Sequence, residues 1–542
     1  MKSLSKRNVI LIALSLVLCL FALGAFAGGQ SREEQTDVYH DLEIFAKIVE
    51  KVSQNYVDDV DTHELILSAI NQMLDQLDPH SQYLDGLDYE DLMVSTRGEF
   101  GGLGIYIVFR DNYPTVVSPI ADTPGDRAGL RGGDQIVEIE GMDTDGWRTD
   151  KAVKYLRGDP GTDVTFKIRR PGSDEAIEYV LTREIINVAS VPYYDTFGDI
   201  GYVKVSSFAK RTADDLDDAI DDLETRGIKG LVLDFRQNPG GLLQAATEVS
   251  ELFLEKDKLV VYTKGRLQNT NRKYYSSNRK IHKGYPVVVM INGASASASE
   301  ILAGALQDWD RAFVVGQTSF GKGTVQTVFT LSETEAIKLT TAKYYTPSGR
   351  SIHKDRPEGL EEAQPGMTTA QRDSEGRPST ETADVNAEKP VFYTSSGRIV
   401  YGGGGITPDL EFEPLLYTDL QRDLERKYMA FTFAVEELDD TKVTENFRTD
   451  DATLERFYAF LAEREFEYEA EDLTEENVDY IRTMIAREVL NHKYGRKAMY
   501  RILLEADPEF QEVLTIMIEA PTLEEMFANA EAQKSIKKAS VE

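Results

Sequence analysis

The chain has a single cysteine among its 542 residues, and this residue, Cys19, lies in an apolar run near the N-terminus. The rest of the chain therefore contains no thiol nucleophile, no disulfide and no metal site built on cysteine. Histidine is also scarce, with six residues in all. A catalytic site in this chain would have few imidazoles from which to draw a general base.

Positive charge is in short supply as well. The 60 lysine and arginine residues stand against 93 aspartate and glutamate residues, which gives a net charge of −33. So large an acidic excess argues against nucleic acid as a partner, because its phosphate backbone needs basic contacts. The length and the 41% content of hydrophobic residues indicate a globular protein of about three or four domains.

The N-terminus contains a long apolar run. A basic start with Lys2, Lys6 and Arg7 precedes an uncharged, mainly apolar stretch over residues 9–27 that ends Ala-Phe-Ala. This order is typical of a secretory signal, so residues 1–27 are predicted to direct export. The run is also close to the length of about 17 residues that spans a bilayer. Attachment to the inner membrane through an uncleaved anchor therefore stays open as the alternative.

Both ends of the remaining chain are predicted to be helical. Apolar residues recur at helical spacing within residues 31–97, and again within the acidic residues 415–542. We interpret the first as a helical layer and the second as a helical appendage, and both offer natural surfaces for a homodimer. Residues 354–390 are rich in polar residues and proline and poor in large apolar ones, which predicts a disordered or surface insertion.

Residues 98–185 change to short apolar runs separated by glycines. The stretch A-G-L-R-G-G-D-Q-I-V-E-I-E-G resembles the small helix, glycine turn, aspartate and strand of PDZ domains. In such domains backbone N–H groups converge on a peptide carboxylate, and the next strand offers its edge to the peptide. A simple glycine turn is the alternative. The resemblance implies a carboxylate-binding loop made of Gly102, Leu103, Gly104 and Ile105.

Predicted strands and helices alternate over residues 186–353, and ordered sequence resumes over 391–414. Residues 231–235 and 286–291 are apolar enough to be buried strands, and amphipathic helices are predicted after them. This alternation favours an α/β layer with a largely parallel sheet. Open sheets of this kind place their sites after the strands and before the helices.

Two turns in this region carry candidate catalytic side chains. The sequence I-N-G-A-S-A-S-A-S-E-I-L-A-G-A-L places Ser297 after an apolar strand and before a helix, and S-F-G-K-G-T-V-Q places Lys322 between two glycines. A serine on a tight turn can expose its hydroxyl as a nucleophile. A lysine can replace histidine as its base when desolvation or a nearby positive charge keeps the amine neutral. A lysine on a solvated loop is the alternative.

An oxyanion would need backbone donors near Ser297. The N-P-G-G turn offers the N–H group of Gly241, and the helix start offers that of Ala298. Gln326 lies four residues beyond Lys322. The two side chains would meet on a helical turn, whereas on an extended strand they would be about 13 Å apart.

Together the motifs resemble those of the carboxy-terminal processing peptidases, also called tail-specific proteases. The PDZ signature, D-F-R-Q-N-P-G-G-L, the Ser297 segment and F-G-K-G-T-V-Q occur in the order of that family, and the resemblance covers residues 40–350 and 391–414. It implies an α/β fold: a crotonase-like protease core with an inserted PDZ domain and helical N- and C-terminal regions. The insertion and the acidic tail depart from the shortest members.

The resemblance also implies roles for individual residues. Ser297 would be the nucleophile, Lys322 the general base, and Gln326 the residue that orients the lysine, with Gly241 and Ala298 as oxyanion-hole donors and with no metal or cofactor. We therefore predict a serine endopeptidase that cleaves protein substrates near free C-terminal tails held by the PDZ domain, alone or with an adaptor lipoprotein. Two alternatives stay open: a PDZ adaptor with an inactive hydrolase-like core, and a crotonase-type acyl-CoA enzyme.

Overall fold

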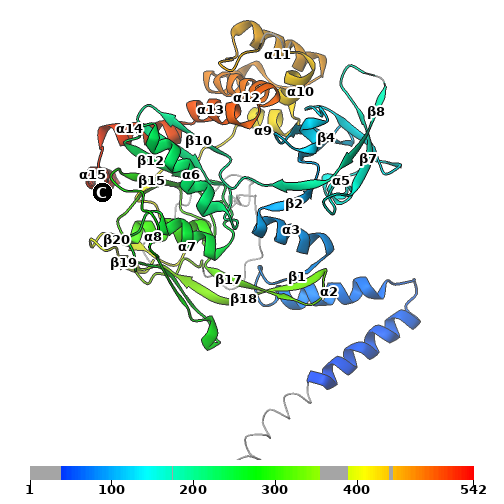
Figure 1. Ribbon diagram of the computed structural model, residues 1–542, viewed down its shortest axis with the longest axis horizontal. Coiled ribbons are helices and arrows are strands. Elements are labelled where there is room, and N and C mark those ends of the chain that lie inside the picture. The colour runs from blue at the N-terminus through cyan, green and yellow to red at the C-terminus, as the bar shows by residue number, and fades with distance from the viewer. Residues whose placement is uncertain (1–37, 174, 355–388, 439–442, 542) are drawn as a thin grey trace, which may run out of the picture. The chain divides into compact units, whose positions relative to one another are not determined.

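The computed structural model (Figure 1) describes residues 38–173, 175–354, 389–438 and 443–541. The predicted signal or anchor, and nearly all of the predicted insertion, lie outside these residues. The described residues form two compact units, one within residues 38–84 and 328–339 and the other within the described parts of residues 85–327 and 340–541. Among the described helices, none is both long and apolar enough to cross a bilayer.

The smaller unit contains the predicted N-terminal helices. Residues 38–55 are helical, and a second helix, α2 (Thr62–Asp75), follows a polar turn. Asp61 begins α2 because its carboxylate accepts hydrogen bonds from the N–H groups of His63 and Glu64. Strand β1 (Gln82–Asp85) pairs with β18 (Glu335–Tyr345), of which residues 335–339 belong to this unit. The Tyr83 hydroxyl donates to Glu335.

In the larger unit, residues 105–182 form the PDZ sheet. Its strands lie in the order β3-β4-β5-β7-β8, with β6 paired to β5. Their bounds are β3 (Ile105–Arg110), β4 (Tyr113–Pro119), β5 (Gln135–Ile139), β6 (Met142–Asp143), β7 (Asp163–Arg169) and β8 (Ala176–Thr182). Helices α4 (Pro124–Arg127) and α5 (Thr149–Leu156) complete the domain. Strand β3 lies at one end of this order, so its outer edge can accept an extended peptide.

The PDZ sheet is joined to the rest by a strand pair. β2 (Glu99–Gly102) runs antiparallel to β9 (Glu184–Asn187). The chain therefore enters and leaves the PDZ domain through adjacent strands, as expected for a domain inserted into a larger fold.

The core sheet has the order β10-β11-β12-β15-β16-β21. Apart from β10, which is antiparallel to β11, its neighbours are parallel, which confirms the predicted sheet type. The bounds are β10 (Tyr193–Phe197), β11 (Ile200–Lys204), β12 (Gly230–Asp234), β15 (Val287–Ile291), β16 (Phe313–Gly316) and β21 (Leu410–Glu411).

Helices cover both faces of this sheet (Figure 1). Helices α6 (Thr212–Thr225), α7 (Leu243–Glu251) and α8 (Ala298–Asp308) pack on one face with Leu231 and Leu233. Helices α14 (Pro508–Glu519) and α15 (Leu523–Val541) pack on the other with Val232. Because consecutive residues of β12 face opposite covered sides, the strand is apolar along its whole length.

A smaller sheet and a hairpin complete the core region. β13 (Leu259–Lys264) pairs with β14 (Lys273–Tyr275) and with the end of β18, and β17 (Thr324–Thr330) also pairs with β18. After the residues that are not described, β19 (Val391–Tyr393) and β20 (Ile399–Tyr401) form an antiparallel pair.

The C-terminal region is helical, as predicted. Helices α9 (Asp419–Arg426), α10 (Met429–Glu436), α11 (Asp451–Glu463), α12 (Glu475–Tyr494) and α13 (Arg496–Ala506) follow one another. The first four share a core around Phe433, Phe457 and Phe460. The interpretation of the whole region as an appendage does not hold for α14 and α15, because these two helices pack against one face of the core sheet. Helical periodicity alone could not show which surface they cover.

Shortening Phe510 to alanine should destabilise the core. Its ring is fully buried and lies 4.9 Å from the ring of Phe197 and 5.0 Å from that of Tyr202. The cavity left by Phe510→Ala should cost about 3–5 kcal/mol in the free energy of unfolding, measured by equilibrium urea unfolding. The control is Ile518→Ala on the same helix, where the side chain is 73% exposed and the cost should stay within about 0.5 kcal/mol. Equal losses in the two variants would contradict the packing described here.

Candidate active site

Ser297 occupies a strained position at the start of α8. Its backbone has φ 54° and ψ −110°, a region that costs a residue other than glycine about 1–3 kcal/mol. The residue is 8% exposed and follows the turn after β15. Strain of this kind is typical of a serine held on a sharp strand-to-helix turn so that its hydroxyl points out of the backbone.

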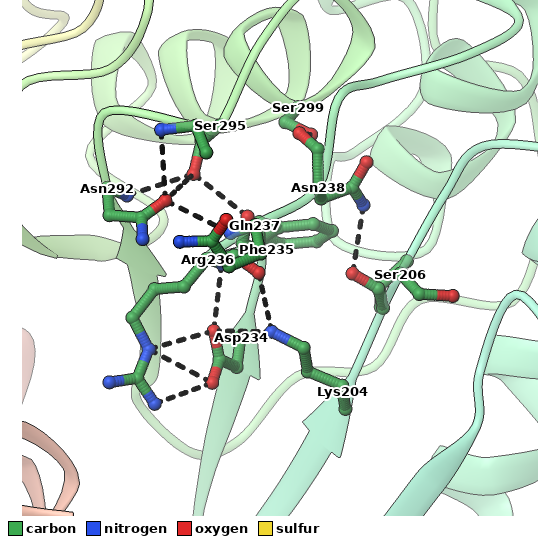
Figure 2. Close-up of polar contacts among 12 residues, drawn as sticks. Lys204, Ser206, Asp234, Phe235, Arg236, Gln237, Asn238, Asn292, Ser295 and Ser299 are labelled. Atoms are coloured by element: carbon green, nitrogen blue, oxygen red, sulfur yellow. Dashed lines mark hydrogen bonds and ion pairs between the residues drawn. The ribbon is translucent and has the colours of Figure 1, made fainter. Parts of the chain in front are cut away.

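The serine turn is bonded to the N-P-G-G turn (Figure 2). Ser295 Oγ donates to the carbonyl of Phe235 at 2.8 Å. The carbonyl of Asn238 accepts from the Ala296 N–H group at 3.0 Å and from Ser299 Oγ at 3.1 Å. The two turns, about 60 residues apart in the chain, therefore form one rigid unit at the ends of β12 and β15.

Glycine is required where the two turns meet. A Cβ on Gly240 would lie 2.6 Å from the carbonyl oxygen of Ala296 and 2.8 Å from the nitrogen of Ala298, and the φ of Gly240 is +97°. At Gly241 a Cβ would collide with the carbonyl of Phe208. Among the described residues, no group accepts a hydrogen bond from the N–H of Gly241 or of Ala298. Both predicted oxyanion donors thus lie beside Ser297 with their N–H groups available, and their role stays a prediction.

A buried carboxylate joins the serine turn to the lysine loop. Glu300 is fully buried, and its Oε2 accepts from the N–H groups of Ser297 at 2.8 Å and of Lys322 at 3.0 Å. Its Oε1 accepts from Ser319 Oγ at 2.6 Å and from the Gly321 N–H group at 2.7 Å. Because the N–H groups of Ser297 and Lys322 both donate to the same oxygen of Glu300, the backbones of these two residues lie side by side.

The protonation of Glu300 is finely balanced. Burial raises the pKa of Glu300 to about 7, although the four hydrogen bonds from Ser319, Gly321, Ser297 and Lys322 act in the opposite direction. All four donors fit the ionised carboxylate, since a protonated one would have to give up an acceptor site. The sequence analysis missed this residue. The signal was present, because a serine followed three residues later by glutamate is a helix-capping pattern.

The loop around Lys322 is fixed from both sides. Phe320 donates its N–H to the carbonyl of Ser295 at 3.0 Å, and Tyr344 donates its N–H to the carbonyl of Gly323 at 2.8 Å. Gly321 has a φ of +90°, and a Cβ on Gly323 would collide with the backbone of His353. The lysine itself is half-buried. The flanking glycines are therefore needed for the loop to pass this close to its neighbours.

Tyr344 is a second residue that the sequence analysis missed. Burial raises the pKa of Tyr344 to about 12, and the nearby Ser297 side chain opposes this shift. The phenol therefore stays protonated at neutral pH beside the candidate nucleophile. Tyrosine in an alternating strand such as β18 is normally a packing residue, so the sequence held no signal of this contact.

Gln326 lies on the extended strand β17, not on a helical turn. Its side-chain amide donates to Thr324 Oγ1 at 2.8 Å and to Thr340 Oγ1 at 3.5 Å. The extended geometry removes the helical-turn argument for a contact with Lys322. A role of Gln326 in orienting the lysine stays a prediction that rests on the family resemblance.

The candidate carboxylate-binding loop of the PDZ domain is held in place by hydrogen bonds to its carbonyl groups. The carbonyls of Leu103 and Gly104 accept from the N–H groups of Gly125 and Ile120, each at 2.8 Å. Within the described part of the chain, the N–H groups of Leu103 and Gly104 donate to no backbone carbonyl, as a loop for an anion requires. Of the other two predicted residues, Gly102 ends β2 and Ile105 begins β3. Peptide binding by these four residues stays a prediction.

One group of described side chains has metal-ligand chemistry. Ligand atoms of Asp217, Asp221 and His282 lie within 4.8 Å of one another. However, the two ring nitrogens of His282 are separately engaged, Nε2 with Asp217 at 2.7 Å and Nδ1 with Glu224 at 2.9 Å. Hydrogen bonding of a buried imidazole between two carboxylates accounts for the arrangement. This pairing also commits His282 to α6, so it is not a base for Ser297.

Comparison with known families gives three matches along the chain. Peptidase family S41 matches residues 199–362, a PDZ domain matches residues 115–170, and the activating protease CtpB N-terminal domain matches residues 25–87. Both candidate turns fall within the first match. The region of α14 and α15 falls outside all three.

Individual proteins are similar over the same region. The carboxy-terminal-processing protease of Bartonella bacilliformis is 46% identical over 59% of this chain and 74% of its own length. The carboxy-terminal processing protease CtpB of Bacillus subtilis is 38% identical over 57% of this chain and 65% of its own length. Among solved structures, the photosystem II D1 C-terminal processing protease aligns over 57% of this chain and 89% of its own, with 28% identity and a TM-score of 0.34. The identity and coverage of the first relative, together with the S41 and PDZ matches, show that the chain belongs to peptidase family S41, among the serine-type carboxy-terminal processing proteases.

Proposed function

We propose that this protein is an exported serine endopeptidase that cleaves protein substrates near their C-terminus, with Ser297 as nucleophile and Lys322 as general base. The observation that carries the proposal is the shared bond to Glu300 Oε2, which places the backbones of these two residues next to each other. The turn of Gly240 and Gly241 against the same serine supports it further.

The chemistry follows from this arrangement. The neutral amine of Lys322 removes the proton from the Ser297 hydroxyl as the oxygen attacks the scissile carbonyl. The N–H groups of Gly241 and Ala298 stabilise the oxyanion that forms. The protonated lysine then gives its proton to the leaving amine, and water releases the acyl group from the serine.

The PDZ domain supplies the preference for tails. The N–H groups of Leu103 and Gly104 would bind the terminal carboxylate, and the open edge of β3 would pair with the residues before it. Residues 1–27 would bring the protein to the periplasm or cell envelope, with membrane attachment if they are not removed. A homodimer through the helical ends and an adaptor lipoprotein remain the candidate partners.

Amidation of a substrate tail tests the proposed recognition. An unfolded protein with a free C-terminus should be cleaved about tenfold faster or more than the same protein with a C-terminal amide, because a charged hydrogen-bonding partner is lost. The rates and the new C-termini are read by mass spectrometry, and a Ser297→Ala sample controls for contaminating proteases. Equal rates for the two substrates would contradict carboxylate recognition.

A further inference from the structure

An arginine at the end of β12 links the oxyanion turn to the C-terminal helices. Arg236 directly precedes residues 237–241, and its guanidinium is largely buried. Nη2 bonds to Asp234 at 2.8 Å and to Asp507 at 2.6 Å, and Nη1 bonds to Glu509 at 2.8 Å. Two of these three carboxylates belong to the start of α14. This helix therefore contacts the residue that directly precedes the turn of residues 237–241 beside Ser297.

Within this network, the Asp234 carboxylate accepts several hydrogen bonds besides those from the Arg236 guanidinium (Figure 2). Asp234 is buried and accepts from Lys204 Nζ at 3.2 Å and from the N–H group of Arg236 at 2.8 Å. It also accepts from the Tyr202 hydroxyl at 2.7 Å. Lys204 Nζ also donates to the carbonyl of Arg236 at 2.6 Å. Burial acts to raise the pKa of Asp234, but the charges of Arg236 and Lys204 hold it well below the usual range. The anion therefore persists at any working pH and fixes one side of Arg236.

Glu509 also reaches the lysine loop. Its Oε2 bonds to Arg236, and its Oε1 accepts from Gln317 Nε2 at 3.3 Å. Gln317 directly follows β16 and begins the segment that runs through Ser319 to Lys322. Glu509 is 8% exposed. The buried carboxylate of Glu509 thus contacts Arg236, which precedes the oxyanion turn, and Gln317, which begins the lysine loop.

The helix that bears these carboxylates is a firm support. Asp507 is its N-cap, with Oδ1 accepting from the Phe510 N–H group at 3.2 Å while Oδ2 bonds to Arg236. Phe510, Val513 and Met517 anchor the same helix on the core sheet. The carboxylates of Asp507 and Glu509 are therefore fixed relative to the strands whose ends they contact.

We propose that Asp507 and Glu509 are positioning residues, which hold the oxyanion turn and the lysine loop at the separation that catalysis needs by acting through Arg236 and Gln317. The inference rests on the proposed function of Ser297, Lys322 and Gly241. A displacement of about 1 Å in such a constellation lowers a rate about a hundredfold, so a lost tether should slow chemistry more than it weakens substrate binding. The C-terminal helix α14, outside the S41 match, would then be a part of the catalytic unit.

The test compares Glu509→Ala with Glu512→Ala. Glu512 lies on the same helix, but its side chain is exposed. For Glu509→Ala, kcat should fall about tenfold or more with KM unchanged, because a charged hydrogen bond is removed. Glu509→Gln keeps one acceptor oxygen and should recover part of the loss, and Glu512→Ala should match the wild type. Asp507→Ala combined with Glu509→Ala should lose less than the product of the two single losses, since both act through Arg236.

Each rate is normalised to the folded fraction measured by circular dichroism. If the loss in Glu509→Ala disappears after this normalisation, or if kcat is unchanged in the double variant, the inference is overturned. A Ser297→Ala control distinguishes failure of the proposed function from failure of the positioning role. Activity that survives in Ser297→Ala refutes the proposed function, whereas an inactive Ser297→Ala beside a fully active Glu509→Ala refutes only the positioning role.

Discussion

Replacing Ser297 or Lys322 by alanine is expected to reduce the rate of peptide hydrolysis about 10⁴-fold or more. The remaining rate would come from substrate binding and the oxyanion donors alone. In the proposed mechanism, Ser297→Ala removes the attacking oxygen, and Lys322→Ala removes the group that takes its proton. The proposed mechanism makes the two residues one catalytic unit, and their backbone N–H groups both donate to Glu300 Oε2. The double variant should therefore be no worse than the poorer single variant, because the second change removes nothing that still operates.

The measurement is kcat/KM on an unfolded protein with a free C-terminus, together with thermal unfolding of each variant. Lys256→Ala serves as the matched control, since this lysine is exposed and should leave both rate and stability unchanged. Retention of wild-type hydrolysis by either active-site variant would rule out the serine–lysine mechanism. A loss explained by unfolding would show as a lower transition temperature, and we expect neither truncation to cause one.

The nature of the enzyme could be predicted from sequence because its signals are local. The glycines around Lys322 and the turn before Ser297 are short motifs, and the parallel sheet follows from runs such as residues 287–291, which are apolar on both faces. The S41 and PDZ matches confirm the family. They also favour a peptidase over an acyl-CoA enzyme, whereas the alternative of a PDZ adaptor with an inactive core is decided by the Ser297→Ala comparison.

The contacts that organise the site were harder to predict. Glu300 had a local signal in its spacing from Ser297, but its bonds to Ser319, Gly321 and Lys322 depend on how a later loop folds back. Tyr344 reaches Ser297 from β18. Such contacts depend on the register and packing of distant segments, and a single sequence carries no information on either.

The same limit applies to α14. Its apolar stripe predicts a helix with one buried face, yet nothing in that stripe names the sheet that it covers. Asp507 and Glu509 read as ordinary acidic residues at a helix start, which the helix dipole favours. Only the fold shows that they face Arg236, more than 270 residues earlier in the chain.

Replacing Glu300 by glutamine should lower activity and change its pH dependence. The carboxylate accepts four hydrogen bonds, whereas the amide nitrogen of glutamine can accept none, so in either orientation of the amide at least one backbone hydrogen bond from the lysine loop is lost. We expect kcat to fall about 10- to 100-fold. In the wild type, ionisation of Glu300 with its pKa of about 7 should make kcat rise as the pH passes through neutrality, and this limb should be absent from Glu300→Gln.

The free energy of unfolding of the wild type should fall with rising pH, whereas kcat should rise. Burial raises the pKa of Glu300 from 4.5 when unfolded to about 7 in the fold, so between these values the folded state holds a proton that the unfolded chain has lost. The free energy of unfolding should therefore fall by about 3 kcal/mol as the pH rises from 4.5 to above 7, where the buried charge must be accommodated. Glu300→Gln carries no titratable proton at this position and should not show this decline.

Urea unfolding and kcat, both measured from pH 5 to pH 8.5, decide the matter together. Compared with the wild type, Glu300→Gln should be less active and, above pH 7, relatively more stable, which is the pattern of a site that trades stability for function. Glu512→Gln controls for the loss of a carboxylate at an exposed position and should follow the wild type in both measurements. If Glu300→Gln and the wild type show parallel pH profiles, Glu300 does not titrate in this range, and its bonds to the two loops serve only to build the fold.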